Sequence, residues 1–138
     1  MVVEASNQKA KTLKKPAKDE VLEWFRKKQW HPFPFQKKTW SAHAKGESGL
    51  IHAPTGTGKT YAAWAGPLIE WMDELGNKSM PKRPPALRVL WITPLRALVK
   101  DTTHSLRTLV EDLQLPWSVE ERTGDTTGSI KAKQRKRF

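Results

Sequence analysis

The residues with the clearest chemical meaning are Ala53 to Thr60, which read Ala-Pro-Thr-Gly-Thr-Gly-Lys-Thr. They fit the pattern Gly-x-x-x-x-Gly-Lys-[Ser/Thr] of a phosphate-binding loop (P-loop), except that Ala53 replaces the first glycine. Glycines at positions 56 and 58 allow backbone amides to turn inward around phosphates, where a side chain would block the approach. The pattern therefore predicts a site for the phosphates of a nucleotide and for Mg²⁺.

The chemistry of the side chains assigns roles within the predicted P-loop. Lys59 is placed to reach the β and γ phosphates, and the Thr60 hydroxyl is placed to bind Mg²⁺, so both are candidate catalytic residues. A helix beginning at about Lys59 would add its N-terminal amides. A chance Gly/Thr turn is disfavoured, because an apolar run precedes the loop and a helical pattern follows it. The loop's predicted nucleotide-binding residues are Thr55, Gly56, Thr57, Gly58, Lys59 and Thr60.

The segments that must position this loop predict an α/β fold. Three short apolar runs are expected as buried strands, at 50–53, 88–92 and 117–121. Helical patterns are expected at about 19–28, 35–45, 59–75 and 95–113. Alternating strands and helices imply a parallel sheet with right-handed crossovers, which binds ligands at the carboxyl ends of its strands. The candidate sites at 53–60, 93–96 and 122–126 each follow a predicted strand, so one functional face is expected.

The composition is that of a soluble domain whose charge is unevenly placed. The 138 residues include no cysteine, which excludes disulfides and thiolate metal sites, and no apolar run is long enough to span a membrane. Of the net charge of +11, residues 1–18 carry five lysines against one glutamate, and residues 131–138 carry five basic residues. These basic ends could contact phosphates or could be solvated tails. Residues 1–18 are expected to be disordered or loosely attached. Most of the seven tryptophans are expected in or near the core.

The P-loop resembles motif I of superfamily 2 helicases, and three further segments follow that family's order. Gln36 lies 23 residues before Lys59 and resembles the Q-motif glutamine. Thr-Pro-Leu-Arg-Ala-Leu at 93–98 resembles motif Ia, and Arg-Thr-Gly-Asp-Thr at 122–126 resembles motif Ib of the large-helicase-related (Lhr) group. Trp-His-Pro-Phe-Pro-Phe-Gln at 30–36 is most similar to the bacterial ligase-associated DEXH-box helicases. The resemblance covers about residues 20–130.

The resemblance implies a RecA-like P-loop NTPase domain and a role for each matching residue. Gln36 would read the edge of adenine in ATP, since an amide both donates and accepts, and Trp30 is the aromatic residue expected nearest to it. One strand of nucleic acid, with DNA favoured, would run along Pro94, Leu95, Arg96, Arg122, Thr123 and Gly124. The family further implies 3′ to 5′ movement, a role in DNA repair, a bacterial cytoplasmic location, and a DNA ligase or nuclease as partner.

The Asp-Glu-x-His segment of these helicases, which positions Mg²⁺ and activates water, does not occur in the sequence. Asp73-Glu74 is the nearest match, but it precedes motif Ia and ends a helix. Residues 19–138 are therefore interpreted as the N-terminal part of the first RecA-like domain, to be joined by the remainder of the motor. We expect an unpaired strand edge with uncovered apolar surface, weak nucleotide binding and no hydrolysis by these residues alone.

Three other functions stay open from the sequence. The first is an RNA helicase of the DEAD-box type, which also has a Q-motif. The second is a small-molecule P-loop kinase, for which the resemblance of Gln36 and of segment 93–98 would be accidental. The third is a non-catalytic basic module that binds nucleic acid through its two basic ends.

Overall fold

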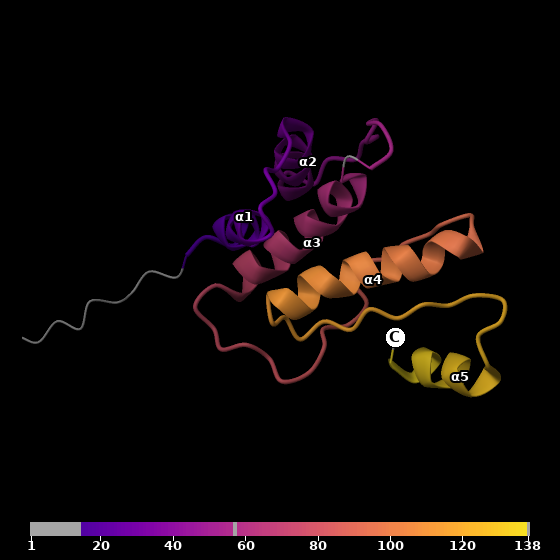
Figure 1. The fold of residues 1–138 in the computed structure, drawn as a ribbon. Helices are drawn as coiled ribbons and strands as arrows, with labels where there is room; N and C mark the ends of the chain where they lie inside the picture. Colours follow the sequence, from indigo (N-terminus) through magenta and orange to yellow (C-terminus); the bar gives the residue numbers. More distant parts are fainter. Residues whose placement is uncertain (1–14, 57, 138) are drawn as a thin grey trace, which may run out of the picture.

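The structure is a computed structural model that describes residues 15–56 and 58–137, and this part of the chain forms five helices (Figure 1). They are α1 (Ala17–Lys27), α2 (Pro34–Ala44), α3 (Lys59–Leu75), α4 (Arg96–Asp112) and α5 (Gly128–Arg137). The four predicted helices are confirmed, and α5 was not predicted from the sequence. Most of the N-terminal segment expected to be disordered, and Thr57 of the P-loop, lie outside the described residues.

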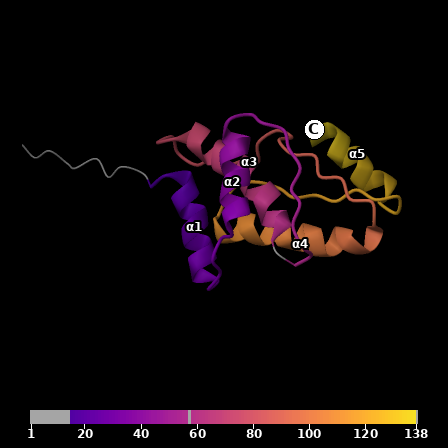
Figure 2. The ribbon, with the colours of Figure 1, turned by 90° about the horizontal axis from the view of Figure 1, so that it is seen from above.

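Helix α3 is the centre of the core, with α1, α2 and α4 packed around it (Figures 1 and 2). Its sequence is apolar on more than one face, which suits a helix that is contacted from several sides. The indole N–H of Trp64 donates to the carbonyl of Leu106 on α4 at 3.1 Å, and that of Trp40 on α2 donates to the carbonyl of Tyr61 at 3.1 Å. These large rings fill the core while their polar atoms stay hydrogen-bonded.

The tryptophans follow the expectation that most of them build the core. Trp24, Trp40, Trp64 and Trp71 are buried, and Trp91 and Trp117 pack against the same cluster while partly exposed. Trp30 is the exception, because 46 % of its surface is exposed.

The three predicted strands are not formed by the described residues. Segments 50–53, 88–92 and 117–121 run without the ladder of backbone hydrogen bonds that defines a strand. A strand needs a neighbour for its N–H and C=O groups, so apolar composition alone does not create one. The parallel sheet expected from the sequence is thus absent from residues 15–56 and 58–137, although the helices expected to flank it are in place.

Apolar side chains on two of these segments face outward instead of lying buried. Leu50 is 91 % exposed, Leu90 76 % and Ile92 81 %. Beside the second segment, a cavity of about 710 Å³ is lined by residues 85–93, the middle of α4, residues 117–122 and α5. Two buried polar atoms, Trp117 Nε1 and Gln134 Oε1, have no hydrogen-bond partner among the described residues. The uncovered apolar surface expected from the sequence is therefore present.

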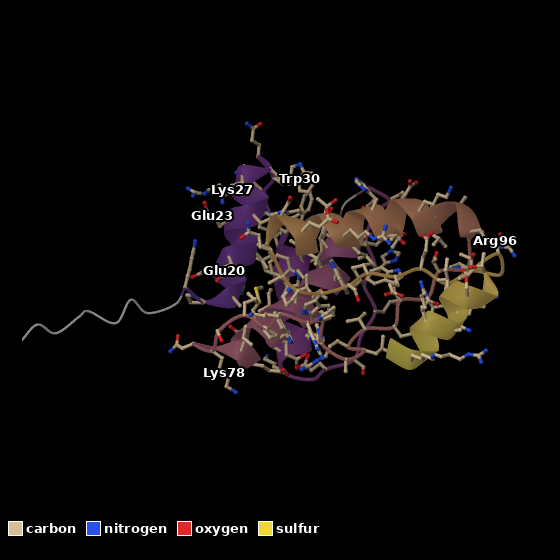
Figure 3. The ribbon with its side chains drawn as sticks, turned by 90° about the horizontal axis from the view of Figure 1, so that it is seen from below. Glu20, Glu23, Lys27, Trp30, Lys78 and Arg96 are labelled. Carbon is tan, nitrogen blue, oxygen red and sulfur yellow. The ribbon has the colours of Figure 1, made fainter. Side chains whose placement is uncertain are left out.

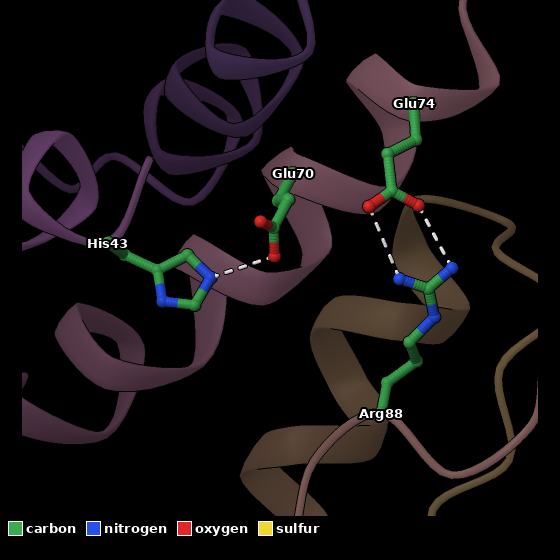
Figure 4. A network of polar contacts seen from close by, with 4 residues as sticks. All are labelled: His43, Glu70, Glu74 and Arg88. Carbon is green, nitrogen blue, oxygen red and sulfur yellow. Dashed lines mark hydrogen bonds and ion pairs between the residues drawn. The ribbon is translucent and has the colours of Figure 1, made fainter. Parts of the chain in front are cut away.

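Polar contacts on α3 fix its neighbours (Figure 4). His43 on α2 lies 3.1 Å from Glu70, and Arg88 in the extended segment pairs with Glu74 through two contacts of 2.9 and 3.3 Å. Asp73 accepts a hydrogen bond from the backbone N–H of Ala17 at the start of α1. Asp73 and Glu74 thus have structural partners at the end of α3, far along the helix from the P-loop.

The junction of α1 and α4 yields a prediction about pH. Asp112 accepts a hydrogen bond from Trp24 Nε1 at 2.7 Å and pairs with Lys28 at 2.9 Å. The Lys28 ammonium, followed by the Trp24 indole, lowers the pKa of Asp112 below its ordinary value of 3.8. A lowered pKa means that this stabilisation is present above the ordinary value and is lost as pH falls through the lowered value.

We expect Asp112→Asn to lower the urea midpoint of unfolding at neutral pH, and the difference from the parent protein to shrink as the pH falls below the ordinary pKa of 3.8. Glu111→Gln is the matched control, because this exposed neighbour makes no side-chain bond within the part of the chain that the structure describes. A midpoint difference that stayed constant down to acidic pH would contradict the assignment.

Candidate nucleotide and nucleic-acid sites

The P-loop ends in the first turn of α3. Gly56 and Gly58 have φ angles of 80° and 82°, in the left-handed region that favours glycine. Gly58 is the N-cap of α3, so Lys59 and Thr60 occupy its first turn, where backbone N–H groups have no partner within the helix. The free N–H groups and the positive end of the helix dipole favour an anion at this place.

Lys59 is folded back onto the loop that precedes it. Its ammonium group donates to the carbonyl of Ala53 at 2.6 Å and to that of Pro54 at 2.8 Å. These carbonyls are neutral acceptors, so a phosphate, which carries a full negative charge, would hold the ammonium more strongly. The charge, the two left-handed glycines and the helix N-terminus fit a nucleotide phosphate chain, and the Thr60 hydroxyl beside Lys59 fits one ligand of Mg²⁺.

Gln36 lies beneath this loop, only 2 % exposed, in the first turn of α2. Pro34 starts the helix, where its missing N–H costs nothing. The Gln36 side chain accepts a hydrogen bond from the N–H of Phe33 at 2.8 Å, and its Nε2 donates to the carbonyl of Gly58 at 3.0 Å. A Cβ at position 58 would lie 2.5 Å from that nitrogen, so only glycine fits. Gln36 thus connects α2 directly to the P-loop.

An aromatic cluster adjoins the first turn of α3. Tyr61 contacts Trp24 and Trp30, with ring centroids 5.1 and 5.9 Å apart. Burial raises the pKa of the Tyr61 phenol above its ordinary value, while a hydrogen bond with Ser105 on α4 acts in the opposite direction. The residues around the P-loop are therefore tied to α1 and α4 through Tyr61. Tyr61 was not among the predicted site residues, since an aromatic residue after the P-loop resembles any other core position.

The second candidate site lies where α4 begins. Pro94 and Leu95 are exposed, and Leu95 is the N-cap of the helix. Arg96, the first helical residue, pairs with Asp125 at 2.8 Å, so the structure brings the two segments around 93–98 and 122–126 together. Figure 3 shows Arg96 at the right-hand end of the molecule, well apart from Trp30. Asp125 was not among the predicted site residues, although it lies within the motif that contains them.

Most backbone N–H groups of the turn at 122–126 donate to oxygen atoms of the same turn. The N–H of Thr123 donates to Thr126 Oγ1 at 2.8 Å, the N–H of Thr126 donates to the Thr123 carbonyl at 3.2 Å, and the N–H of Asp125 donates to Thr123 Oγ1 at 3.3 Å. The Thr123 hydroxyl predicted to contact nucleic acid therefore serves the turn in this structure. Arg122 is exposed and lines the rim of the cavity described above.

The described residues place no group of three or more His, Asp or Glu side chains where it could hold a metal ion. Among the same residues, no helix combines the length and apolar character needed to cross a membrane. The predicted binding residues gather at two places, the P-loop and the start of α4, where Arg96 pairs with Asp125.

Known proteins place this chain in a family. The DEAD/DEAH box helicase family matches residues 33–137. The chain is 41 % identical over 90 residues to the Lhr helicase/probable uracil glycosylase of Mycolicibacterium smegmatis. The aligned region covers 62 % of this chain and 5 % of that protein. It is 34 % identical over 125 residues to the ATP-dependent helicase Lhr-Core of Sulfolobus acidocaldarius. Here the aligned region covers 86 % of this chain and 14 % of that protein.

A further relative is the Nucleolar RNA helicase 2-A of Xenopus laevis, 35 % identical over 83 residues, covering 60 % of this chain and 10 % of the relative. No solved structure gives a significant match. The chain spans at most about a seventh of the length of these relatives. Because the family match covers the P-loop, Gln36 and both segments joined by the Arg96–Asp125 pair, the chain belongs to the DEAD/DEAH box helicase family and is similar to its Lhr helicases.

Proposed function

We propose that the chain carries the ATP-binding part of an ATP-dependent DNA helicase or translocase that moves 3′ to 5′ and acts in DNA repair. The supporting observation is the P-loop, where Lys59 lies at the N-terminus of α3 behind two left-handed glycines. Membership in the helicase family supports the same function and disfavours a small-molecule kinase or a purely basic binding module. A bacterial cytoplasmic location and a DNA ligase or nuclease partner follow from the resemblance alone.

In this proposal the phosphates of ATP replace the carbonyls of Ala53 and Pro54 as acceptors for the Lys59 ammonium. Thr55 to Gly58 supply backbone amides, and the Thr60 hydroxyl holds Mg²⁺, which would neutralise charge on the transferred phosphoryl group. Asp73 and Glu74 are engaged at the far end of α3. We therefore propose that the carboxylate needed for hydrolysis comes from the remainder of the motor.

Gln36 is proposed to read adenine. Its amide still has one N–H and one acceptor lone pair beyond the bonds to Gly58 and Phe33, which is enough for the paired donor and acceptor on the adenine edge. Because the side chain is buried, the base has to approach through the residues that cover it. Trp30, half-exposed beside Tyr61, is the aromatic side chain proposed to pack near the base.

The start of α4 and the turn at 122–126 are proposed as part of the track for single-stranded DNA, through Pro94, Leu95, Arg96, Arg122, Thr123 and Gly124. Exposed arginines and small backbone-rich turns contact phosphates without reading sequence. RNA as the substrate is the second candidate, and the similarity to an RNA helicase of Xenopus laevis favours testing it. We also propose that segments 50–53, 88–92 and 117–121 become strands of the parallel RecA-like sheet when neighbours cover their apolar side chains.

We expect Lys59→Ala to reduce ATP turnover of the intact protein by about two orders of magnitude or more, because the cation that holds the phosphates is lost. The measurement is steady-state phosphate release with single-stranded DNA and, in parallel, with RNA of equal length. Lys45→Ala, which removes an exposed lysine outside the P-loop, is the control and should keep full turnover. If neither DNA nor RNA stimulated ATP turnover, the protein would not be a translocase. If residues 1–138 alone hydrolysed ATP and this activity needed Lys59, the expected dependence on the rest of the motor would be wrong.

We expect Gln36→Ala to weaken ATP binding more than GTP binding, because only adenine offers the edge that the amide is proposed to read. The measurement is the ratio of KM values for ATP and GTP in the intact protein. Gln36→Glu is a second variant that keeps an acceptor for Phe33 but loses the amide donor. If the variants weakened the binding of ATP and GTP equally, Gln36 would act only by holding Gly58 of the P-loop. The proposal that Gln36 reads adenine would then be wrong.

A further inference from the structure

The Arg96 side chain is bound by Asp125, which lies 29 residues further along the chain in the turn at 122–126, and it passes close to Gly124. Its Nη1 donates to Asp125 Oδ2 at 2.8 Å, and a Cβ built on Gly124 would lie 2.7 Å from its Nη2. Both charged side chains are well exposed, Arg96 at 70 % and Asp125 at 78 %. The guanidinium therefore lies against the glycine backbone in open solvent, at the end of α4 seen in Figure 3.

The carboxylate that holds Arg96 belongs to a closed turn. Thr123 and Thr126 bind each other's backbone, and the N–H of Asp125 is held by the Thr123 hydroxyl. These three bonds restrict the backbone on both sides of Asp125. An exposed ion pair between two free side chains has little directional effect, whereas one partner fixed on a rigid turn can orient the other.

One edge of the Arg96 guanidinium stays available to a ligand while Asp125 is bound to the other. Asp125 accepts from Nη1 alone, and no other acceptor contacts Arg96 within the part of the chain that the structure describes. The Nε and Nη2 groups on the other side present two parallel N–H bonds, the geometry that matches two oxygens of a phosphate. Asp125 and a phosphate can therefore occupy different edges of the same guanidinium.

We propose that Asp125 is a positioning residue that orients Arg96 over Gly124, so that the free edge of the guanidinium takes one backbone phosphate of the nucleic-acid strand. The inference rests on the proposed function, because it assumes that the strand passes Arg96. The carboxylate repels the phosphate to some degree, but an arginine that is already oriented loses less conformational freedom when it binds. Gly124 contributes because a Cβ at this position would lie 2.7 Å from Nη2 and displace the guanidinium.

The test is binding of labelled oligothymidylate to the intact protein across a range of salt concentrations. Arg96→Ala should weaken binding and reduce the slope of log K against log salt by about 0.7, the value for one phosphate contact with a single strand. Asp125→Ala should weaken binding severalfold and reduce the slope likewise. The double variant should bind no more weakly than Arg96→Ala, and Asp125→Glu should recover part of the loss.

Two further variants separate orientation from charge and from folding. Asp101→Ala removes the same charge from the exposed face of α4 and should not weaken binding. Gly124→Ala keeps the carboxylate but blocks the place of Nη2, so it should weaken binding as Asp125→Ala does, with an unchanged urea midpoint. Tighter binding by Asp125→Ala, or additive losses in the double variant, would overturn the proposal. If Arg96→Ala itself had no effect, the proposed track would fail, which is a distinct result.

Discussion

The start of α3 is the constraint on which the rest of the structure depends. Its first turn carries backbone amides that we propose to bind phosphate, so each contact that fixes α3 also fixes the P-loop. Gly58 precedes the helix in a left-handed conformation, and Gln36 holds its carbonyl from below. On the other side, Tyr61 joins the aromatic cluster of α1, and Trp64 binds the backbone of α4. A loop of glycines and threonines would be mobile alone, but here it is joined to three helices.

Much of this arrangement could be read from the residues, because the signals are local. The apolar spacing of α4, the glycines around the P-loop and the proline at the start of α2 each act within a few residues of themselves. The sheet could not be confirmed in the same way. Leu50, Leu90 and Ile92 are as apolar as buried strand residues, but whether they are covered depends on partners that no local pattern encodes. Helix α5 was missed for a related reason, because its basic sequence lacks an apolar face.

The same distinction applies to the candidate sites. The type of residue indicated which side chains could bind phosphate, but not how they are held before a ligand arrives. Lys59 is bound to the carbonyls of Ala53 and Pro54, Gln36 to two backbone groups, and Arg96 to Asp125. Each of these polar groups therefore has a partner within the chain, and a ligand exchanges or extends these bonds instead of finding free groups. Sequence pattern carries no information on such internal partners, since they come from distant positions.

The helices form a packed cluster, whereas the extended apolar segments are uncovered, and this difference has a consequence for folding. Helices α2 and α3 contact each other through residues 21 to 27 positions apart, and contacts between residues close in sequence form fast. The extended segments carry exposed leucine and isoleucine residues and pair with no strand within residues 15–56 and 58–137. During synthesis the helical cluster can be complete while those segments still face solvent, and this is the state in which such surfaces associate with one another or with chaperones. Expression temperature and chaperone supply should therefore affect the yield of this protein more strongly than the stability of its helices would indicate.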